Sequence, residues 1–286
     1  MGLAADLTPL LQPVYLPLAA WIANHHRQGA RVLGINGAQG TGKSTLTALL
    51  RTLLDAGFGL RAAGFSIDDI YLTRAERERL ARTVHPLLIT RGVPGTHDVA
   101  LGIRTIEALK SAGPGARIPI PAFDKATDDR KPEARWPVWE GRCDVILFEG
   151  WCVGAVPEPE ERLREPVNDL ERTEDPDGRW RRYVNDQLKG PYRQLFAQID
   201  RLIMLKVPSM ACVFRWRLQQ ERQLAQRLAA EANAPLRIMD EDKLRRFIQH
   251  YERLTCWMLE EMPHRADIVL HLGEDHQIHT IQVNRP

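Results

Sequence analysis

One short segment of the 286-residue sequence has the residue types and the spacing of a phosphate-binding loop. Residues 37–44 read Gly-Ala-Gln-Gly-Thr-Gly-Lys-Ser and match the pattern G-x-x-x-x-G-K-[ST]. Glycines let successive backbone N–H groups converge on an anion, and the N-terminus of a following helix adds partial positive charge. We expect Lys43 to reach the β- and γ-phosphates and the Ser44 hydroxyl to bind Mg²⁺. The segment therefore predicts binding of a nucleoside triphosphate, and the alternative is a glycine-rich turn that binds nothing.

Two further carboxylate positions follow apolar segments of the chain. Asp68 and Asp69 come directly after residues 60–67, and Glu149 ends the apolar run 144–149. In phosphoryl transfer a carboxylate accepts the hydroxyl proton or helps to hold the metal. We assign the proton to Asp68 and a secondary role to Asp69, and the alternative is a helix N-cap. An ionised Glu149 at the end of a buried strand is costly without a cation, so we place it beside Mg²⁺ rather than in solvent.

Basic residues in three segments are candidates for binding the acceptor and closing the site. The loops 91–98 and 119–131 could form a pocket for a small hydroxylated anion, because Arg and Lys pair with carboxylates. Beyond residues 200–207, Arg215 and Arg217 could close over the transferring phosphate as a lid. The alternative is ordinary surface charge, which for the two arginines means a solvated helix face. The candidate acceptor-site residues are Asp68, Tyr71, Arg91, His97, Asp124 and Lys125.

Strand-like and helix-like segments alternate along the chain, which predicts an α/β fold with a mainly parallel sheet covered on both faces by helices. The expected strands are 31–35, 60–67, 144–149, 200–207 and 267–272, with an edge strand at 277–283. The expected helices are 13–28, one after the glycine loop, 74–82, one ending near 111, one opened by Arg215 and reaching about 232, and 240–259 with Asp240 as N-cap. The carboxyl ends of the strands share one edge, where ligands bind in such folds.

We interpret residues 1–286 as one domain with three additions. Residues 1–30 form an N-terminal helical extension, and residues 113–142 form an irregular loop punctuated by prolines. A loop of this length in a compact domain is usually functional, so we assign it to the acceptor site. Residues 156–190 are expected to be an insertion of two exposed helices with little chemistry.

The composition is typical of a cytoplasmic globular enzyme. The hydrophobic content of 44% supports a substantial core, and no stretch approaches the length of a membrane helix. The net charge of +2 comes without a block of like charge, so no nucleic-acid surface and no membrane partner are expected. The four cysteines lie far apart, which argues for a reducing compartment and against a structural zinc site. No signal peptide is evident, and the oligomeric state stays open.

The chain resembles the D-glycerate 3-kinase family, which belongs to the P-loop kinases together with phosphoribulokinase, uridine kinase and pantothenate kinase. The resemblance covers about residues 31–272 and rests on G-A-Q-G-T-G-K-S, F-S-I-D-D-I-Y-L-T, R-G-V-P-G-T-H-D, P-A-F-D-K, V-I-L-F-E-G-W and F-R-W-R-L-Q-Q-E. Two features depart from it: Ile70 stands where these families often have Phe, and 113–142 does not keep the usual spacing of its basic residues.

The resemblance implies a three-layer P-loop NTPase fold and transfer of the γ-phosphoryl group of ATP to a hydroxyl of D-glycerate, giving 3-phosphoglycerate. The implied catalytic residues are Lys43, Asp68, Glu149 and Arg217, and the implied metal-side residues are Ser44, Asp68 and Glu149. The implied nucleotide-binding residues are Gly37, Ala38, Gln39, Gly40, Thr41, Gly42, Lys43, Ser44, Thr45 and Arg215.

Two alternatives remain open from the sequence. The acceptor could be pantothenate or a nucleoside, although the cations of the two acceptor loops favour an acid. The protein could also be an ATP-driven switch without a small acceptor that binds RNA or protein through the helices of 156–190.

Overall fold

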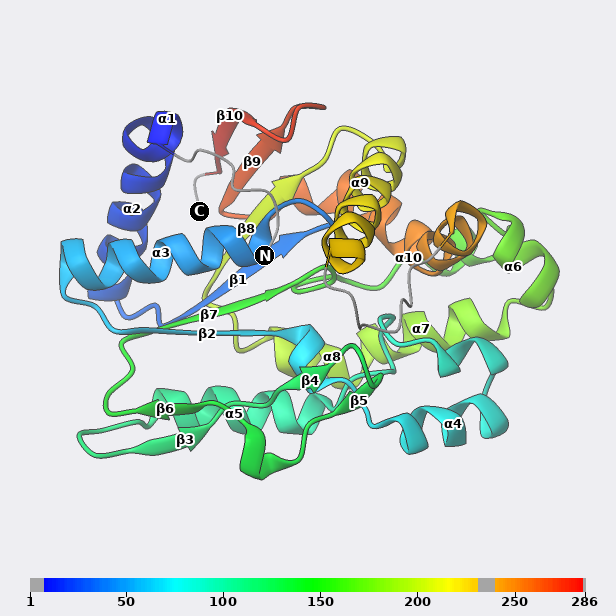
Figure 1. Cartoon of the computed structure of the whole chain (residues 1–286), viewed down its shortest axis with the longest axis horizontal. Coiled ribbons are helices and arrows are strands. Elements are labelled where there is room, and N and C mark those ends of the chain that lie inside the picture. The colour runs from blue at the N-terminus through cyan, green and yellow to red at the C-terminus, as the bar shows by residue number, and fades with distance from the viewer. Residues whose placement is uncertain (1–7, 231–239, 285–286) are drawn as a thin grey trace.

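Six strands form the central sheet in the computed structural model, which describes residues 8–230 and 240–284 (Figure 1). The strand order is β10-β9-β8-β1-β7-β2. Neighbouring strands run parallel except β10, which is antiparallel to β9. The strands are β1 (Val32–Gly37), β2 (Ala62–Ser66), β7 (Val145–Gly150), β8 (Arg201–Lys206), β9 (Ile268–Leu272) and β10 (Ile278–Val283). The predicted mainly parallel sheet is confirmed.

Helices cover both faces of this sheet and complete three layers (Figure 1). One face packs against α2 (Leu16–Arg27), α3 (Lys43–Phe58) and the start of α9 (Met210–Ala230). The other face packs against α5 (Val99–Lys110), α7 (Arg179–Lys189), α8 (Pro191–Phe196) and α10 (Glu241–Glu261). The remaining helices are α1 (Thr8–Leu10), α4 (Arg74–Thr83) and α6 (Asp169–Glu174), with short turns η1 (Leu11–Tyr15), η2 (Ile67–Ile70), η3 (Pro86–Ile89), η4 (Glu133–Arg135), η5 (Glu160–Leu163) and η6 (Met262–His264). None of the helices within 8–230 and 240–284 is long and apolar enough to span a bilayer.

The strands are apolar on both faces because both faces are covered. Side chains alternate between the faces of a strand, so each strand feeds two cores. The core on the α3 side contains Leu33, Ile35, Val145, Leu147, Ile203 and Leu205, whereas the core on the α10 side contains Val32, Ile146, Phe148, Leu202 and Met204. Every residue of β1 and β7 is buried. This explains why the two strands read as short, continuous apolar runs.

The strand register brings three strand ends to one edge of the sheet. Glu149 of β7 lies opposite Ile35 of β1 and opposite Ser66 of β2. The glycine loop follows β1, and the turn that carries Asp68 follows β2. Because the three strands are parallel and adjacent, the glycine loop, Asp68 and Glu149 meet at their carboxyl ends.

The segment 113–142 is more regular than the sequence predicts. It holds two small antiparallel sheets, β3 (Arg117–Pro119) with β6 (Val138–Glu140), and β4 (Phe123–Asp124) with β5 (Asp129–Arg130). The prediction of a wholly irregular loop was wrong. Prolines are compatible with two-stranded ladders, because both strands are edges and one side of each needs no N–H donor.

The helix that carries Arg215 and Arg217 also begins earlier than predicted. Helix α9 starts at Met210, five residues before Arg215, and the Ser209 hydroxyl accepts the Cys212 N–H at 3.4 Å. The apolar residues of this first turn pack into the α3-side core, which explains why they join the helix. The predicted end of this helix near residue 232 lies outside the described residues. At α10 the predicted N-cap is confirmed, since the Asp240 side chain accepts the Lys243 N–H at 2.9 Å.

The two helices predicted within 156–190 are present as α6 and α7, but the prediction that they are simply exposed was wrong. Arg253 of α10 is 9% exposed and pairs with Glu171 at 2.7 Å and with Glu158 at 3.1 Å. Within the segment, Arg181 pairs with the fully buried Asp175 at 3.1 Å. Some charged residues of this segment form buried ion pairs and others lie at the surface, and a charge pattern alone does not distinguish the two.

Replacing Arg253 with methionine is expected to lower the free energy of unfolding by roughly 3–5 kcal/mol, because it leaves the fully buried Glu171 without its cation and removes one of the two arginines that pair with Glu158. Arg172→Met is the matched control, since Arg172 pairs with Asp169 at an exposed site. It should cost less than about 1 kcal/mol. Denaturant unfolding followed by circular dichroism measures both. Equal, small effects would contradict a structural role for the buried network.

Candidate active site

The glycine loop joins β1 to α3 in a shape that an anion can enter. Gly42 has φ 85°, a left-handed conformation that favours glycine, and it is the N-cap of α3. The Thr41 hydroxyl donates to the Ala38 carbonyl at 2.9 Å, and Lys43 Nζ donates to the same carbonyl at 3.0 Å. The half-buried ammonium therefore lies folded over its own loop. Burial lowers the pKa of Lys43, and the carboxylates of Glu149 and Asp68 oppose that shift.

The side chains of Ser44, in the first turn of α3, and Glu149, near the end of β7, are in direct contact. The Ser44 Oγ donates to Glu149 Oε1 at 2.6 Å, and Glu149 is 7% exposed. A hydroxyl and a carboxylate oxygen side by side beside a phosphate-binding loop are the ligand types that Mg²⁺ takes, together with phosphate oxygens and water. In the described part of the chain no group of three or more Cys, His, Asp or Glu forms a protein-only metal cage. The donor set fits a magnesium ion shared with a nucleotide.

Asp68 lies in the turn after β2, the outermost strand of the sheet, and its carboxylate contacts two donors. Its Oδ1 accepts the Tyr71 O–H at 2.7 Å, and its Oδ2 pairs with Lys125 Nζ at 2.7 Å. Burial raises the pKa of Asp68, but Lys125, Tyr71 and Lys43 outweigh burial and bring it down to about 2. Asp68 is therefore ionised at neutral pH and hydrogen-bonded to Tyr71 at the end of its own turn and to Lys125 of the β4–β5 hairpin.

Asp69 has a different surrounding from its neighbour. Its Oδ2 accepts the Ser66 N–H at 3.0 Å, and the Ser66 hydroxyl accepts the Asp68 N–H at 3.2 Å in return. This reciprocal capping box fixes the turn between β2 and η2. Burial raises the pKa of Asp69 to about 6, and the charge of Asp68 adds to the shift. The Asp69 carboxylate therefore stabilises its own turn, whereas the Asp68 carboxylate contacts Tyr71 and Lys125.

Tyr251 of α10 is a central residue that sequence reasoning missed. Its O–H donates to the Arg91 carbonyl at 2.9 Å. Burial and the Asp68 charge raise the pKa of Tyr251, whereas Arg91 and Arg217 act in the opposite direction. The charges of Asp68, Arg91 and Arg217 therefore all act on this phenol, which links α10 to the 91–98 loop. Gly92 has φ 132°, and a Cβ there would meet the Tyr251 oxygen at 2.1 Å, so the loop needs glycine at this position.

A cluster of arginines surrounds Asp128, a second residue that was missed. Arg74 and Arg77 pair with its carboxylate at 2.9 and 3.1 Å, and Arg91 also binds it. Asp128 has φ 58°, uncommon for a non-glycine residue, which turns the tip of the β4–β5 hairpin towards α4. Arg74 also pairs with Glu78 at 2.9 Å, which leaves the guanidinium groups of Arg77 and Arg91 to share the single charge of Asp128. Arg77 is fully buried, although its helix reads as uniformly charged and solvated.

His97 is buried between Tyr71 and Tyr192. Its ring stacks on Tyr71 with centroids 4.6 Å apart, and its Nδ1 lies 2.5 Å from the Tyr192 oxygen. That oxygen also accepts the Gly95 N–H at 2.9 Å, so Tyr192 ties the histidine ring to the backbone of its own loop. Nε2 has no partner among the described residues. Burial lowers the pKa of His97 to about 3, which keeps the ring neutral.

This neutral histidine predicts loss of stability in acid. The pKa of His97 falls from 6.5 to about 3 on folding, so its contribution is present above pH 6.5 and is lost as pH falls towards 3. His97→Gln should therefore reduce the drop in unfolding free energy between about pH 7.5 and about pH 5 by roughly 2 kcal/mol. The exposed His264→Gln is the control. Denaturant titrations at both pH values test this, and an unchanged slope would contradict it.

Three predicted site residues make their hydrogen bonds and ion pairs outside these clusters. Arg215 is exposed and pairs with Glu274 at 2.8 Å, whereas Arg217 is 25% exposed and pairs with Glu221 at 2.5 Å. Asp124 accepts the Ala126 N–H at 3.0 Å and so stabilises its own turn. The site roles of these and the other predicted residues stay predictions. Trp216, between the two arginines, lies against Gly40, which brings α9 over the glycine loop.

The three-layer fold, the phosphate-binding loop and the neighbouring carboxylates define the class of P-loop kinases. Two curated proteins are similar in sequence. The "Uncharacterized kinase mug58" of Schizosaccharomyces pombe is 34% identical over 259 residues, which cover 84% of this chain and 87% of that protein. The chloroplastic D-glycerate 3-kinase of Arabidopsis thaliana is 32% identical over 256 residues, and this chain spans about half of it (52%). No protein-family model matches the chain.

A solved structure agrees with these relatives. The D-glycerate 3-kinase of Cryptococcus neoformans superposes with a TM-score of 0.76 at 25% identity, covering 94% of this chain and 97% of that one. The chain belongs to the D-glycerate 3-kinase family. The expected P-loop NTPase fold and the expected kinase class are confirmed.

Proposed function

We propose that this protein transfers the γ-phosphoryl group of ATP to a hydroxyl of D-glycerate and releases 3-phosphoglycerate. The observation that carries the proposal is the position of Asp68, which follows β2 beside the strand end that carries Glu149 and pairs with Lys125 of the hairpin that carries Asp128. An acceptor held there meets a carboxylate base and the positive charge of Arg91, which is only partly balanced by Asp128. Relatives named D-glycerate 3-kinase support the choice of acceptor.

The residues take the following roles in the proposed reaction. Lys43 leaves the Ala38 carbonyl and pairs with the β- and γ-phosphates, while the N–H groups of the loop hold the phosphate chain. Asp68 orients the acceptor hydroxyl and accepts its proton, with Tyr71 fixing one carboxylate oxygen. Arg217 on α9 adds positive charge beside the transferring group.

Mg²⁺, when bound with ATP, would neutralise charge that develops on the β- and γ-phosphate oxygens. Ser44 and Glu149 would hold it, because their oxygens already lie 2.6 Å apart, and Asp68 lies on the same side of the loop. The cytoplasm stays the expected compartment.

A panel of acceptors tests the proposed function. ATP consumption should rise strongly with D-glycerate and stay near its background with glycerol, pantothenate and uridine. Phosphorylation of glycerol as efficient as that of glycerate would remove the need for a carboxylate anchor. ATP turnover that no acceptor stimulates would favour the switch protein instead.

Arg91 is the first candidate for the carboxylate of the acceptor. Its guanidinium binds Asp128 and lies over the Phe123 ring at 5.5 Å, so its orientation is fixed. Arg91→Lys should raise KM for glycerate by about tenfold, because lysine does not reproduce a bidentate pair, and should change KM for ATP less. The control is Arg74→Lys, which alters the same Asp128 cluster from its exposed side. Steady-state kinetics with each substrate varied separately would contradict the assignment if both variants behaved alike.

A further inference from the structure

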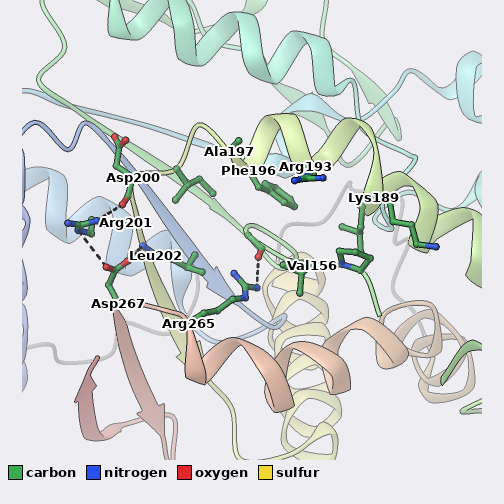
Figure 2. Close-up of a pocket in the computed structure, with 15 residues that line it drawn as sticks. Val156, Lys189, Arg193, Phe196, Ala197, Asp200, Arg201, Leu202, Arg265 and Asp267 are labelled. Atoms are coloured by element: carbon green, nitrogen blue, oxygen red, sulfur yellow. Dashed lines mark hydrogen bonds and ion pairs between the residues drawn. The ribbon is translucent and has the colours of Figure 1, made fainter. Parts of the chain in front are cut away.

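A cavity of about 620 Å³ lies at the edge of the sheet opposite the glycine loop. Asp200 and Asp267 on its wall immediately precede β8 and β9, so the cavity lies at the amino ends of these strands. Figure 2 shows α8, with Arg193, Phe196 and Ala197, on the opposite wall. None of the predicted nucleotide or acceptor residues lines it. Its volume falls within the range of about 300–1,000 Å³ that small-molecule sites occupy.

The body of the cavity is apolar. Side chains from four separate segments contribute to it, namely Val156, Pro157, Leu188, Phe196, Ile199 and Leu202. An apolar surface left in contact with water is costly, and a ligand that covers it gains about 25 cal/mol per Å². The walls come from the sheet on one side and from α7 and α8 on the other, so a ligand would bridge two layers of the fold.

The two carboxylates on the cavity wall already accept hydrogen bonds from backbone N–H groups. Asp200 Oδ2 accepts the N–H groups of Arg31 and Val32 at 2.7 and 2.8 Å. Asp267 Oδ2 accepts the Leu202 N–H at 2.7 Å. Both carboxylates therefore anchor strand ends, and a cationic ligand would have to compete with these bonds. The two acidic residues do not make the cavity a cation site.

Three of the four basic residues of the cavity are also paired. Arg201 lies 3.5 Å from Asp267, and Lys189 lies 2.9 Å from an Asp186 oxygen. Arg265 donates to the Gly154 carbonyl at 2.6 Å (Figure 2) and pairs with a glutamate one turn earlier. Arg193 differs, because its side chain makes no ion pair or hydrogen bond with any residue in 8–230 or 240–284. It sits on the same side of α8 as Phe196, one turn away.

We propose that this cavity is a binding site for a small molecule with an apolar body and one anionic group. Arg193 pairs with the anion, and Phe196 and Leu202 pack against the body. A polyanion is a poor fit, since only one cation on the wall lacks a partner in the described part of the chain. The site is separate from the proposed kinase reaction, and its test needs no catalytic activity.

Two dyes of nearly the same shape test the charge requirement. 8-Anilinonaphthalene-1-sulfonate is an apolar monoanion, and N-phenyl-1-naphthylamine is the same body without the sulfonate. Both are titrated into the full chain with saturating MgATP, so that the nucleotide site is filled. The anionic dye should bind saturably to one site and more tightly than the neutral dye. No saturable binding of the anionic dye below about 1 mM would overturn the proposal.

Three variants then locate the site. Arg193→Gln should raise the Kd of the anionic dye by about tenfold and leave the Kd of the neutral dye unchanged. Arg179→Gln is the matched control, because Arg179 is exposed on neighbouring α7 and lies outside the cavity. Ala197→Trp, which fills the cavity from an exposed position, should remove binding of both dyes, with dye-free thermal unfolding as the check of folding. Wild-type binding by Arg193→Gln, or by a folded Ala197→Trp, would overturn the assignment.

Discussion

Replacing Lys43 with alanine should reduce kcat by about 10²-fold or more and leave the fold intact. The hydrogen bond of the ammonium within the described part of the chain is to the Ala38 carbonyl of its own loop, and Lys43 is not part of either core, so its loss removes no core packing. What is lost is a fixed positive charge for the β- and γ-phosphates at the moment when charge develops there. The measurements are acceptor-dependent ATP consumption and the circular dichroism spectrum.

Lys110→Ala is the matched control for this prediction. Lys110 is also half-buried and donates to Gln198 at 3.0 Å, but it lies at the end of α5, away from the glycine loop. Its activity should stay near that of the wild type. Near-normal turnover by Lys43→Ala with an unchanged spectrum would remove Lys43 from the site.

Asp68→Asn should lower kcat by roughly 10²–10⁴-fold with little change in KM for ATP. The amide keeps the shape of the side chain and can still accept the Tyr71 O–H, but it cannot take a proton from the acceptor. Asp69→Asn is the control, since an amide oxygen can also accept the Ser66 N–H. It should be nearly as active as the wild type.

The outcome of this pair decides the role of the doublet. A large loss of kcat in Asp69→Asn together with a small loss in Asp68→Asn would mean that the roles of the two residues are reversed. Titration of Mg²⁺ separates a base from a metal ligand, because loss of a ligand raises the magnesium concentration needed for half-maximal rate and loss of a base does not.

The parts of the site that were predictable from the sequence depend on local patterns and on one topological rule. The glycine loop is encoded in eight consecutive residues, and short apolar runs identify the strands on either side of it. The contact between Ser44 and Glu149 then follows, because the carboxyl ends of adjacent parallel strands meet at one edge. No knowledge of side-chain packing is needed for this step.

The missed parts depend on distant packing. Tyr251 lies 160 residues from the Arg91 carbonyl to which it donates, and its helix has an ordinary amphipathic pattern. Arg77 sits in a helix whose charged sequence is the same whether the side chain is solvated or buried against Asp128. The sequence Asp128-Asp129 lies between an aromatic residue and basic residues and was the local sign of a carboxylate that pairs with arginines here. The same two residues are also common in an ordinary surface turn, so the sequence did not distinguish the two.

The buried ion pairs of Arg253 with Glu158 and Glu171 also limit which segments of this chain can be removed or exchanged. Segments that begin and end near each other on a surface are often treated as modules that can be trimmed or exchanged. Residues 156–190 do not have that freedom, because their removal would take away both counter-charges of Arg253 and the apolar contacts of Trp180 and Leu188. In this protein the segment contributes side chains to the core on the α10 side of the sheet. A minimal version of the enzyme would have to keep it or replace Arg253 in the same step.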